Sequence, residues 1–344
     1  MNWLDAPRLR GALCFGRTLP PEVTNPFPGA LFAAHPSLPI GSLRGVNPDT
    51  DTRLRVAAIG FLNPAPLMWD FEHPPLSSTL KKRYRIDRMT PAECAARLSD
   101  GRADIGLIPI ASLATTPGLQ ILPGCTIASK GRVRSLILVH RASRTLSELR
   151  SVAADTASRT TLAYARIMFH MWGNAEVPFL PMVADLDAML ERADAAILIG
   201  DPALLALEER INRSERTGEE LVYRDMAEEW RALTGLPYVS AVWGAAHGRI
   251  ARSTAAKNAP LDESVVDDFI RSRDHGLENI DALVAEWSAR FPIPEQTIRT
   301  YLTANIHYVL DEECVEGMRG FFRMAAEYGV LPPYTVDVEE LVAR

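Results

Sequence analysis

The sequence predicts an α/β fold, because short apolar runs alternate with amphipathic segments of helical period along most of the chain. Runs at residues 56–62, 103–109 and 133–140 are strand-sized, and turn residues bound each of them. Between the first two runs, Thr90 and Glu93 have the spacing of a helix-capping box. The resulting order of strand, helix and strand predicts a largely parallel sheet with helices on both faces.

The same alternation resumes in a second unit after residue 140. An apolar run at residues 238–243 then leads the chain out of this unit, and after Gly244 the apolar positions keep a helical period to the end, including a stripe at residues 298–310. The expected strands of the second unit are SVAAD, VPFLPMV and AAILIG, and the expected helices begin at TASRTT, DLDAML and DPALLA. We therefore predict three parts: an irregular extension at 1–52, a discontinuous first lobe at 53–140 and 241–344, and a second lobe at 141–240.

Composition excludes several classes of protein. The chain has 344 residues, is 47% hydrophobic and 23% charged, and carries a formal charge of −6 from acidic and basic residues that are mixed along its length. It has no basic footprint for nucleic acid, and its longest apolar runs are far below the roughly 18 residues of a membrane span. The N-terminus lacks a charged and then apolar leader, and the four cysteines lack disulfide or zinc spacing. These features predict a cytoplasmic protein with no membrane, nucleic acid or metal partner.

The stretch GFLNPAPL places an amide at the end of the first strand. Pro64 and Pro66 have no N–H to donate to a sheet, so the strand must end near Asn63. In open α/β sheets, ligands collect at the carboxyl ends of the strands. Asn63 is therefore either a turn residue or the first polar group of a pocket.

The stretch DTASRTT at residues 155–161 crowds hydroxyl groups into a strand-to-helix turn. The start of a helix presents free N–H groups and partial positive charge, so these hydroxyls would complete a cradle for a carboxylate or phosphate. Serine and threonine also cap helices for structural reasons alone, and the arginine is also compatible with a solvated first turn. The candidate anion-binding residues are Thr156, Ser158, Arg159, Thr160 and Thr161.

Three further polar or flexible positions lie at strand ends. ILIGDPAL places Gly200 and Asp201 after a buried strand, although Asp before Pro is also an ordinary helix start. Ser135 is a polar residue early in an otherwise apolar strand. The chain has no HExxH, Walker A, G-x-S-x-G or G-x-G-x-x-G motif, so metal, nucleophilic, nucleotide and nicotinamide chemistry lack support.

Five segments occur in an order that resembles the chorismate dehydratases of the futalosine route to menaquinone. The resemblance covers roughly residues 53–332, and it implies the type II periplasmic-binding-protein fold. In that fold two α/β lobes are joined by two crossing strands, and the ligand lies in the cleft between the lobes. The segments are GFLNPAPL, the strand pair ADIGLIPI and GRVRSLILV, DTASRTT, DAAILIGDPAL and EEWRALTGLPYVSAVW.

The resemblance implies a hydro-lyase that removes water from chorismate to give 3-[(1-carboxyvinyl)oxy]benzoate, without a metal or organic cofactor. Asn63 matches the pocket amide of the family, and Ser135 matches the serine after the G-x-V turn. Ser158, Thr160 and Thr161 match the hydroxyl-rich helix start. Small, neutral donors of this kind can bind the two carboxylates of chorismate without dense positive charge.

Some points stay open at the level of sequence. Residues 107–110 read Leu-Ile-Pro-Ile and residue 112 is Ser, where the family has a Pro-Val-Ser-Ser-like segment followed by an acidic residue. A side-chain hydroxyl contact from that strand end is therefore missing, and backbone groups there stay an alternative. The proton acceptor is either Asp201 or the enolpyruvyl carboxylate of the substrate, and we favour the second because no His or Glu accompanies the motifs. The alternative functions are a 1,4-dihydroxy-6-naphthoate synthase of the same route and a non-catalytic protein that binds small carboxylates.

Overall fold

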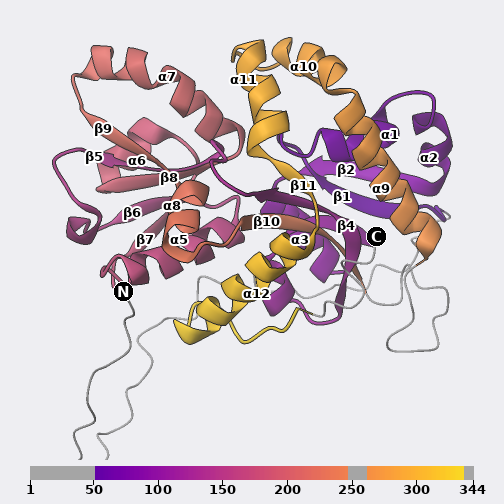
Figure 1. Cartoon of the computed structure of the whole chain (residues 1–344), viewed down its shortest axis with the longest axis horizontal. Helices are drawn as coiled ribbons and strands as arrows, with labels where there is room; N and C mark the ends of the chain where they lie inside the picture. The colour runs from indigo at the N-terminus through magenta and orange to yellow at the C-terminus, as the bar shows by residue number, and fades with distance from the viewer. Residues whose placement is uncertain (1–50, 247–261, 337–344) are drawn as a thin grey trace, which may run out of the picture. The chain divides into compact units, whose positions relative to one another are not determined.

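The structure is a computed structural model that describes residues 51–246 and 262–336 (Figure 1). Within these ranges the strands form one sheet of six and one sheet of five. Almost all of the predicted extension at 1–52, together with Cys14, lies outside the described residues. No helix in the described ranges combines the length and the apolar character needed to span a bilayer.

The first sheet is mixed, whereas the sequence predicted a largely parallel one. Its strand order is β11-β4-β10-β3-β1-β2; β1 pairs in parallel with β2 and β3, and every other neighbouring pair is antiparallel. The prediction was wrong because β10 returns from the other sheet and inserts between β3 and β4. The strands are β1 (Leu54–Ile59), β2 (Tyr84–Met89), β3 (Ile105–Pro109), β4 (Leu119–Ser129), β10 (Tyr238–Ala246) and β11 (His307–Val309).

The second sheet has the order β7-β6-β8-β5-β9. Its β6 pairs in parallel with β7 and β8, and β5 runs antiparallel to β8 and β9. The expected short strands of this unit are confirmed, and β9 is an addition that the sequence analysis did not predict. The strands are β5 (Leu136–Arg141), β6 (Val152–Asp155), β7 (Phe179–Met182), β8 (Ala195–Ile199) and β9 (Leu221–Asp225).

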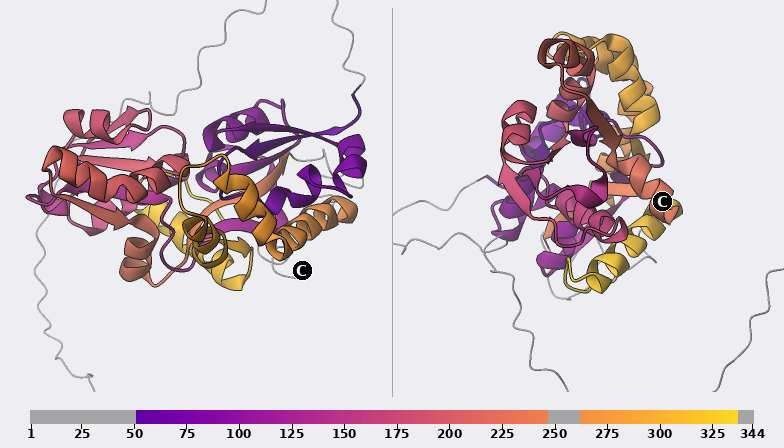
Figure 2. Two further views of the ribbon diagram at one scale, coloured as in Figure 1. Left: turned by 90° about the horizontal axis from the view of Figure 1, so that it is seen from above. Right: turned by 90° about the vertical axis from the view of Figure 1, so that its left-hand side faces the viewer.

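Helices pack beside both sheets, and the two sheets lie in separate halves of the described part of the molecule (Figures 1 and 2). We call the first sheet with α1–α4 and α9–α11 the first lobe, and the second sheet with α5–α8 the second lobe. The helices are α1 (Trp69–Glu72), α2 (Ser77–Arg83), α3 (Pro91–Ser99), α4 (Ala111–Thr115), α5 (Arg159–Met171), α6 (Leu186–Arg192), α7 (Asp201–Thr217), α8 (Met226–Thr234), α9 (Glu263–Glu278), α10 (Ile280–Ser288), α11 (Glu295–Thr300) and α12 (Glu312–Glu327).

The chain passes between the sheets twice, after β4 and after β9. Both passages between the sheets come before the lobe boundaries expected at residues 140 and 241. The strand β5 belongs entirely to the second sheet, and β10 joins the first sheet from Tyr238 onward. The division of the chain into lobes at those residue numbers stays a prediction.

The C-terminal helix α12 packs against β10 of the first sheet and α5 of the second lobe. Phe321 of this helix contacts Tyr164 of α5 with ring centroids 4.3 Å apart, and Tyr164 also stacks on Tyr238 at 3.8 Å. The helical period predicted to the end of the chain is confirmed in this helix, whose Met318 and Phe322 are buried in the core together with Phe321. The helical period expected through residues 298–310 was wrong at its end, since a π-helical turn at Tyr301–Asn305 leads into β11.

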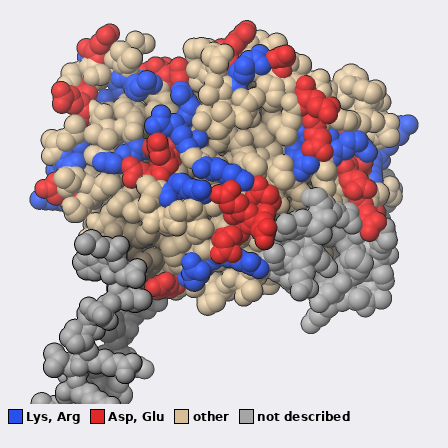
Figure 3. Space-filling view, viewed as in Figure 1, with Lys and Arg blue, Asp and Glu red and all other residues tan. Residues whose placement is uncertain are grey.

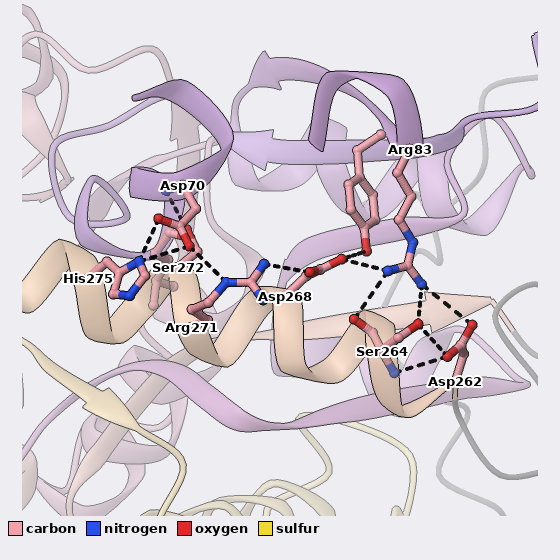
Figure 4. A network of polar contacts seen from close by, with 10 residues as sticks. Asp70, Arg83, Asp262, Ser264, Asp268, Arg271, Ser272 and His275 are labelled. Carbon is pink, nitrogen blue, oxygen red and sulfur yellow. Dashed lines mark hydrogen bonds and ion pairs between the residues drawn. The ribbon is translucent and has the colours of Figure 1, made fainter. Parts of the chain in front are cut away.

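Buried carboxylates in the first lobe attach α9 to α1 and β2 (Figure 4). Asp70 contacts His275 Nδ1 at 2.9 Å and Arg271 Nε at 3.3 Å. Asp268 accepts from the Tyr84 hydroxyl at 2.7 Å and from Arg271 at 2.7 Å. Each buried charge therefore has a partner, as burial of an ionised carboxylate requires. On the outer face that Figure 3 shows, acidic and basic side chains are mixed, as the sequence predicted.

Candidate active site

A cavity of about 40 Å³ lies between the two lobes. The ends of β1, β3 and β8 contribute to it, together with β4, β5, β10 and the start of α5. The position agrees with the rule that ligands collect at the carboxyl ends of strands in α/β sheets. The lining residues are Ile59, Phe61, Asn63, Pro91, Pro109, Ile127, Val133, Ser135, Leu136, Ser158, Thr161, Ile199, Gly200, Ser240, Ala241 and Ile306.

The polar side chains of this lining are all neutral. They are Asn63, Ser135, Ser158, Thr161 and Ser240, and no titratable side chain stands among the described residues that line the cavity. Hydroxyl and amide groups can both donate and accept hydrogen bonds. The cavity can therefore bind carboxylates through neutral donors, but it presents no side chain of its own for taking up a proton near neutral pH.

Asn63 both forms a turn and lines the cavity, so the two interpretations of GFLNPAPL hold together. The strand β1 ends at Ile59, earlier than predicted, and the turn is closed by the Ala65 N–H, which donates to the Leu62 carbonyl at 3.0 Å. The Oδ1 atom of Asn63 is buried and accepts no hydrogen bond from the described residues. A buried amide oxygen without a partner is costly, so this atom is free to accept a hydrogen bond from a group in the cavity.

Ser158 and Thr161 also combine capping with the lining of the cavity. Ser158 is the N-cap of α5, and its Oγ accepts from the Thr161 N–H at 3.3 Å and from the Thr161 hydroxyl at 3.2 Å. Two other candidates of this turn, Thr156 and Arg159, are exposed and do not line the cavity.

Thr160 lies beside these residues but does not line the cavity. Its side chain is buried, and its Oγ1 accepts from the backbone N–H of Ala111 at 3.0 Å. Ala111 is the first residue of α4, where the backbone N–H has no partner within the helix. The hydroxyl of Thr160 is therefore already engaged by the first lobe.

Gly200 lines the cavity, and its backbone permits only glycine without strain. Its φ of 63° and ψ of −141° lie in a region that L-residues rarely adopt. A Cβ at this position would lie 2.7 Å from the ring of Phe61, which also lines the cavity. The Gly200 N–H donates to the Ser135 carbonyl at 2.7 Å and so joins β8 to β5 at the cavity wall.

Asp201 follows Gly200 and points to the first lobe rather than into the cavity. Its Oδ1 accepts from the backbone N–H of Leu62 at 3.0 Å. Burial raises the pKa of Asp201 to about 6, and the hydrogen bond from Leu62 acts in the opposite direction. Asp201 does not line the cavity.

Ser135 is buried and is positioned by Asp225, which the sequence analysis did not single out. Asp225 accepts from the backbone N–H groups of Val133 at 3.0 Å and Arg134 at 2.6 Å, and Arg134 has a φ of 65°. Asp225 is also the N-cap of α8, a role that the position of an Asp before a helical segment could have indicated. Ser240 was missed too, although it is a polar residue in an apolar run, like Ser135.

Comparison with known proteins agrees with this arrangement. A family model described as menaquinone biosynthesis matches residues 54–327. The chain belongs to this menaquinone biosynthesis family. It is also similar to a protein of Thermus thermophilus named chorismate dehydratase, with 26% identity over 248 residues that cover 69% of this chain and 85% of the relative.

Solved structures support the fold of this menaquinone biosynthesis family member. A Candida albicans gene product described as having the generic periplasmic-binding-protein fold aligns with a TM-score of 0.56 and 14% identity, over 82% of this chain and 92% of the other. The periplasmic aliphatic sulphonate binding protein of Escherichia coli aligns with a TM-score of 0.54 and 15% identity, over 85% and 96% of the two chains. With the two α/β lobes, these neighbours confirm the predicted periplasmic-binding-protein-like fold.

Two details of this family member concern contacts outside the cavity. From residues 107–110 only Pro109 lines the cavity, and Ser112 is buried, with an Oγ that has no partner among the described residues.

A cluster of His307, Asp311 and Cys314 has the side-chain types of a metal site.

The Asp311 carboxylate of this cluster is already occupied by protein groups. It contacts Lys130 at 2.6 Å and His307 at 2.8 Å, and it accepts from the Cys314 N–H at 3.0 Å as the N-cap of α12. An ammonium group at that distance competes with a cation for the same oxygen. We assign the cluster to an ion-paired helix cap.

Proposed function

We propose that this protein removes water from chorismate to form 3-[(1-carboxyvinyl)oxy]benzoate. The observation that carries the proposal is the cavity lining, which offers one amide and four hydroxyl groups and no titratable side chain among its described residues. A dicarboxylate that carries its own leaving group and its own carboxylate base suits such a lining. Membership of the menaquinone biosynthesis family and the relative named chorismate dehydratase support the choice of substrate.

The start of α5 is the proposed site for one substrate carboxylate. Partial positive charge at a helix N-terminus favours an anion, and the hydroxyls of Ser158 and Thr161 lie on the cavity side of this helix start. Asn63 and Ser135 contribute further neutral groups from the ends of β1 and β5. Hydrogen bonds from neutral donors to an ionised acceptor are strong enough to hold a dianion without an arginine in the cavity.

The elimination breaks the C3–H and C4–O bonds of chorismate and forms the C3–C4 double bond that completes the aromatic ring. The proton and the hydroxide leave together as water, so no oxidant or reductant is needed. We propose that the enolpyruvyl carboxylate of the substrate takes the proton and that the Asn63 amide donates to the departing hydroxyl. The placement of Asp201 outside the cavity lining supports this choice over Asp201 as the acceptor.

The small size of the cavity supports a separation of the lobes for substrate entry. About 40 Å³ holds a few water molecules. Pockets for organic ligands usually have roughly 300–1,000 Å³. We therefore propose that chorismate enters with the lobes apart and that closure then removes water and aligns the C4 hydroxyl with the C3 proton.

We also keep the predicted cytoplasmic location as part of this proposal. Cys94, Cys125 and Cys314 are buried and free, and burial raises the pKa of each thiol. Thiols that remain reduced suit a reducing compartment. The substrate of the proposed reaction is a charged metabolite in solution, which needs no membrane partner.

The test of the proposed function is incubation of the purified full chain with chorismate, followed by mass spectrometry. We expect a product that is lighter than chorismate by one water. A non-catalytic binding protein would bind chorismate in calorimetry and leave its mass unchanged. A 1,4-dihydroxy-6-naphthoate synthase would neither consume chorismate nor release this product, and either result would overturn the proposal.

Thr161→Val is expected to weaken chorismate binding about tenfold or more. A hydrogen bond to a charged group contributes roughly 1.5–3 kcal/mol, and this variant removes the hydroxyl that lines the cavity while Ser158 still caps α5. Calorimetric titration with chorismate measures the affinity. Thr145→Val is a matched control, because Thr145 caps the short 3-10 helix at Leu146–Glu148 and does not line the cavity. An unchanged affinity for Thr161→Val would show that its hydroxyl serves only the helix start.

A further inference from the structure

Three backbone N–H groups in a loop and two helix starts of the first lobe donate to acceptors of the second lobe. A further bond of this kind joins the Val239 N–H of the crossing strand β10 to the Tyr164 hydroxyl oxygen at 3.2 Å. We call the first three hydrogen bonds the clasp. Two of the acceptors are side-chain atoms and one is a backbone carbonyl. The bonds are Leu62 N–H to Asp201 Oδ1 at 3.0 Å, Ala92 N–H to the Ala157 carbonyl at 3.2 Å, and Ala111 N–H to Thr160 Oγ1 at 3.0 Å.

The clasp surrounds the cavity without lining it. None of its residues is among those that line the cavity, yet each bond has a chain neighbour that does. The adjoining cavity residues are Asn63 and Gly200 for the first bond, Pro91 and Ser158 for the second, and Thr161 for the third.

Two of the three donors are helix-start N–H groups that have no partner within their own helix. Ala92 and Ala111 lie in the first turns of α3 and α4, where backbone N–H groups have no partner within the helix. When the lobes are together, these groups are removed from water and depend on the second lobe. When the lobes are apart, water can bond to them instead. The clasp therefore stabilises the closed form relative to the open form more than it stabilises either lobe against unfolding.

We propose that Asp201 and Thr160 are positioning residues that hold the lobes closed over the substrate and do not contact it. This inference rests on the proposed function, because closure is the step that shields the elimination from water. It changes the role expected for both residues, since the sequence indicated a substrate contact for Thr160 and a possible proton acceptor in Asp201. Their side chains instead complete the first lobe's backbone hydrogen bonds.

Asp201→Asn and Asp201→Ala distinguish the clasp from acid–base catalysis. The amide oxygen of asparagine can still accept from the Leu62 N–H, whereas alanine leaves that donor without a partner. We expect Asp201→Asn to keep kcat/KM for chorismate within about threefold and Asp201→Ala to lose roughly tenfold or more. Equal, near-complete loss in both variants would identify Asp201 as the proton acceptor and overturn the proposal. Asp185→Ala, which removes a carboxylate from the start of α6 in the same lobe, is the control.

Thr160→Val and Thr160→Ser test the clasp without substrate. Spin labels at Lys82 and Glu191, which are exposed residues of the two lobes, report the distance between the lobes in a Cys14→Ser background. We expect valine to shift the distribution toward longer distances and to change the thermal midpoint little, and serine to restore the short distance. A lower midpoint with an unchanged distance distribution would show that Thr160 only stabilises the fold.

The label experiment also separates this inference from the proposed function. It uses the ligand-free full chain, so its result does not depend on whether the protein converts chorismate. A wild-type chain that fails to convert chorismate would contradict the proposed function, and the distance distributions would still decide whether Thr160 holds the lobes closed.

Discussion

Asn63→Asp is expected to fold like the parent chain and to dehydrate chorismate roughly a hundredfold or more slowly. The side chain lines the cavity, and its buried Oδ1 has no hydrogen-bond partner among the described residues. The substitution replaces the Nδ2 amide with a second carboxylate oxygen of nearly the same size. It would place a carboxylate beside a dianionic substrate. Two like charges about 4 Å apart repel by roughly 4 kcal/mol at the effective dielectric of a partly buried site. Steady-state kinetics with chorismate and a thermal melt measure the two effects.

Asn63→Ala is the matched comparison for this prediction. Alanine removes the amide without adding charge, so we expect a loss of about tenfold, as for one hydrogen bond to a polar or charged group. Both variants keep Pro64 and Pro66, which stiffen the turn after Asn63. An Asn63→Asp protein that turns over chorismate at the wild-type rate would show that Asn63 is a turn residue alone.

Gly200→Ala is expected to lower kcat/KM for chorismate more than tenfold and to lower the thermal midpoint by a few degrees. The added Cβ would lie 2.7 Å from the Phe61 ring across the cavity, so either the ring or the second lobe must move. Overpacking of this kind costs roughly 1–3 kcal/mol, in addition to backbone strain at a φ of 63°. Because Phe61 belongs to the first lobe, we expect the displacement to oppose closure.

Gly218→Ala is the control that separates backbone strain at a positive φ from the contact with Phe61. Gly218 ends α7 with a φ of 69°, and no atom lies within 4 Å of the Cβ that alanine would add. We expect a smaller loss of thermal stability, from backbone strain in the left-handed region alone, and unchanged chorismate kinetics. Equal kinetic losses in Gly200→Ala and Gly218→Ala would remove the Phe61 contact as the explanation.

The order of helices and strands could largely be predicted, because that order follows from local patterns. The capping box of Thr90 and Glu93 is present at the start of α3, and β3 ends at Pro109 as expected. Pairing between distant strands has no comparable local signal. The insertion of β10 between β3 and β4 depends on contacts across more than a hundred residues. The strand β4 was missed because Pro123 and Gly124 interrupt its apolar pattern.

The sequence allowed us to predict which turns lie at the site, but not which side chains of those turns line the cavity. The segment DTASRTT does begin a helix at the cavity, yet only Ser158 and Thr161 line it. Neighbouring residues of a helix point about 100° apart, so Thr160 meets the first lobe while Thr161 meets the cavity. Which direction faces the ligand depends on how the lobes pack. For the same reason the sequence did not show that Asp201 bonds to Leu62.

The proton NMR spectrum of chorismate mixed with the purified full chain shows directly whether the protein dehydrates this substrate. We expect the signals of the cyclohexadiene ring to disappear and aromatic ring signals to replace them, while the enolpyruvyl methylene signals remain. Asn63→Asp in the same buffer is the control and is expected to leave most of the chorismate unchanged. A wild-type sample in which chorismate persists, or in which the methylene signals are lost as pyruvate forms, would contradict the dehydration of chorismate in this cavity.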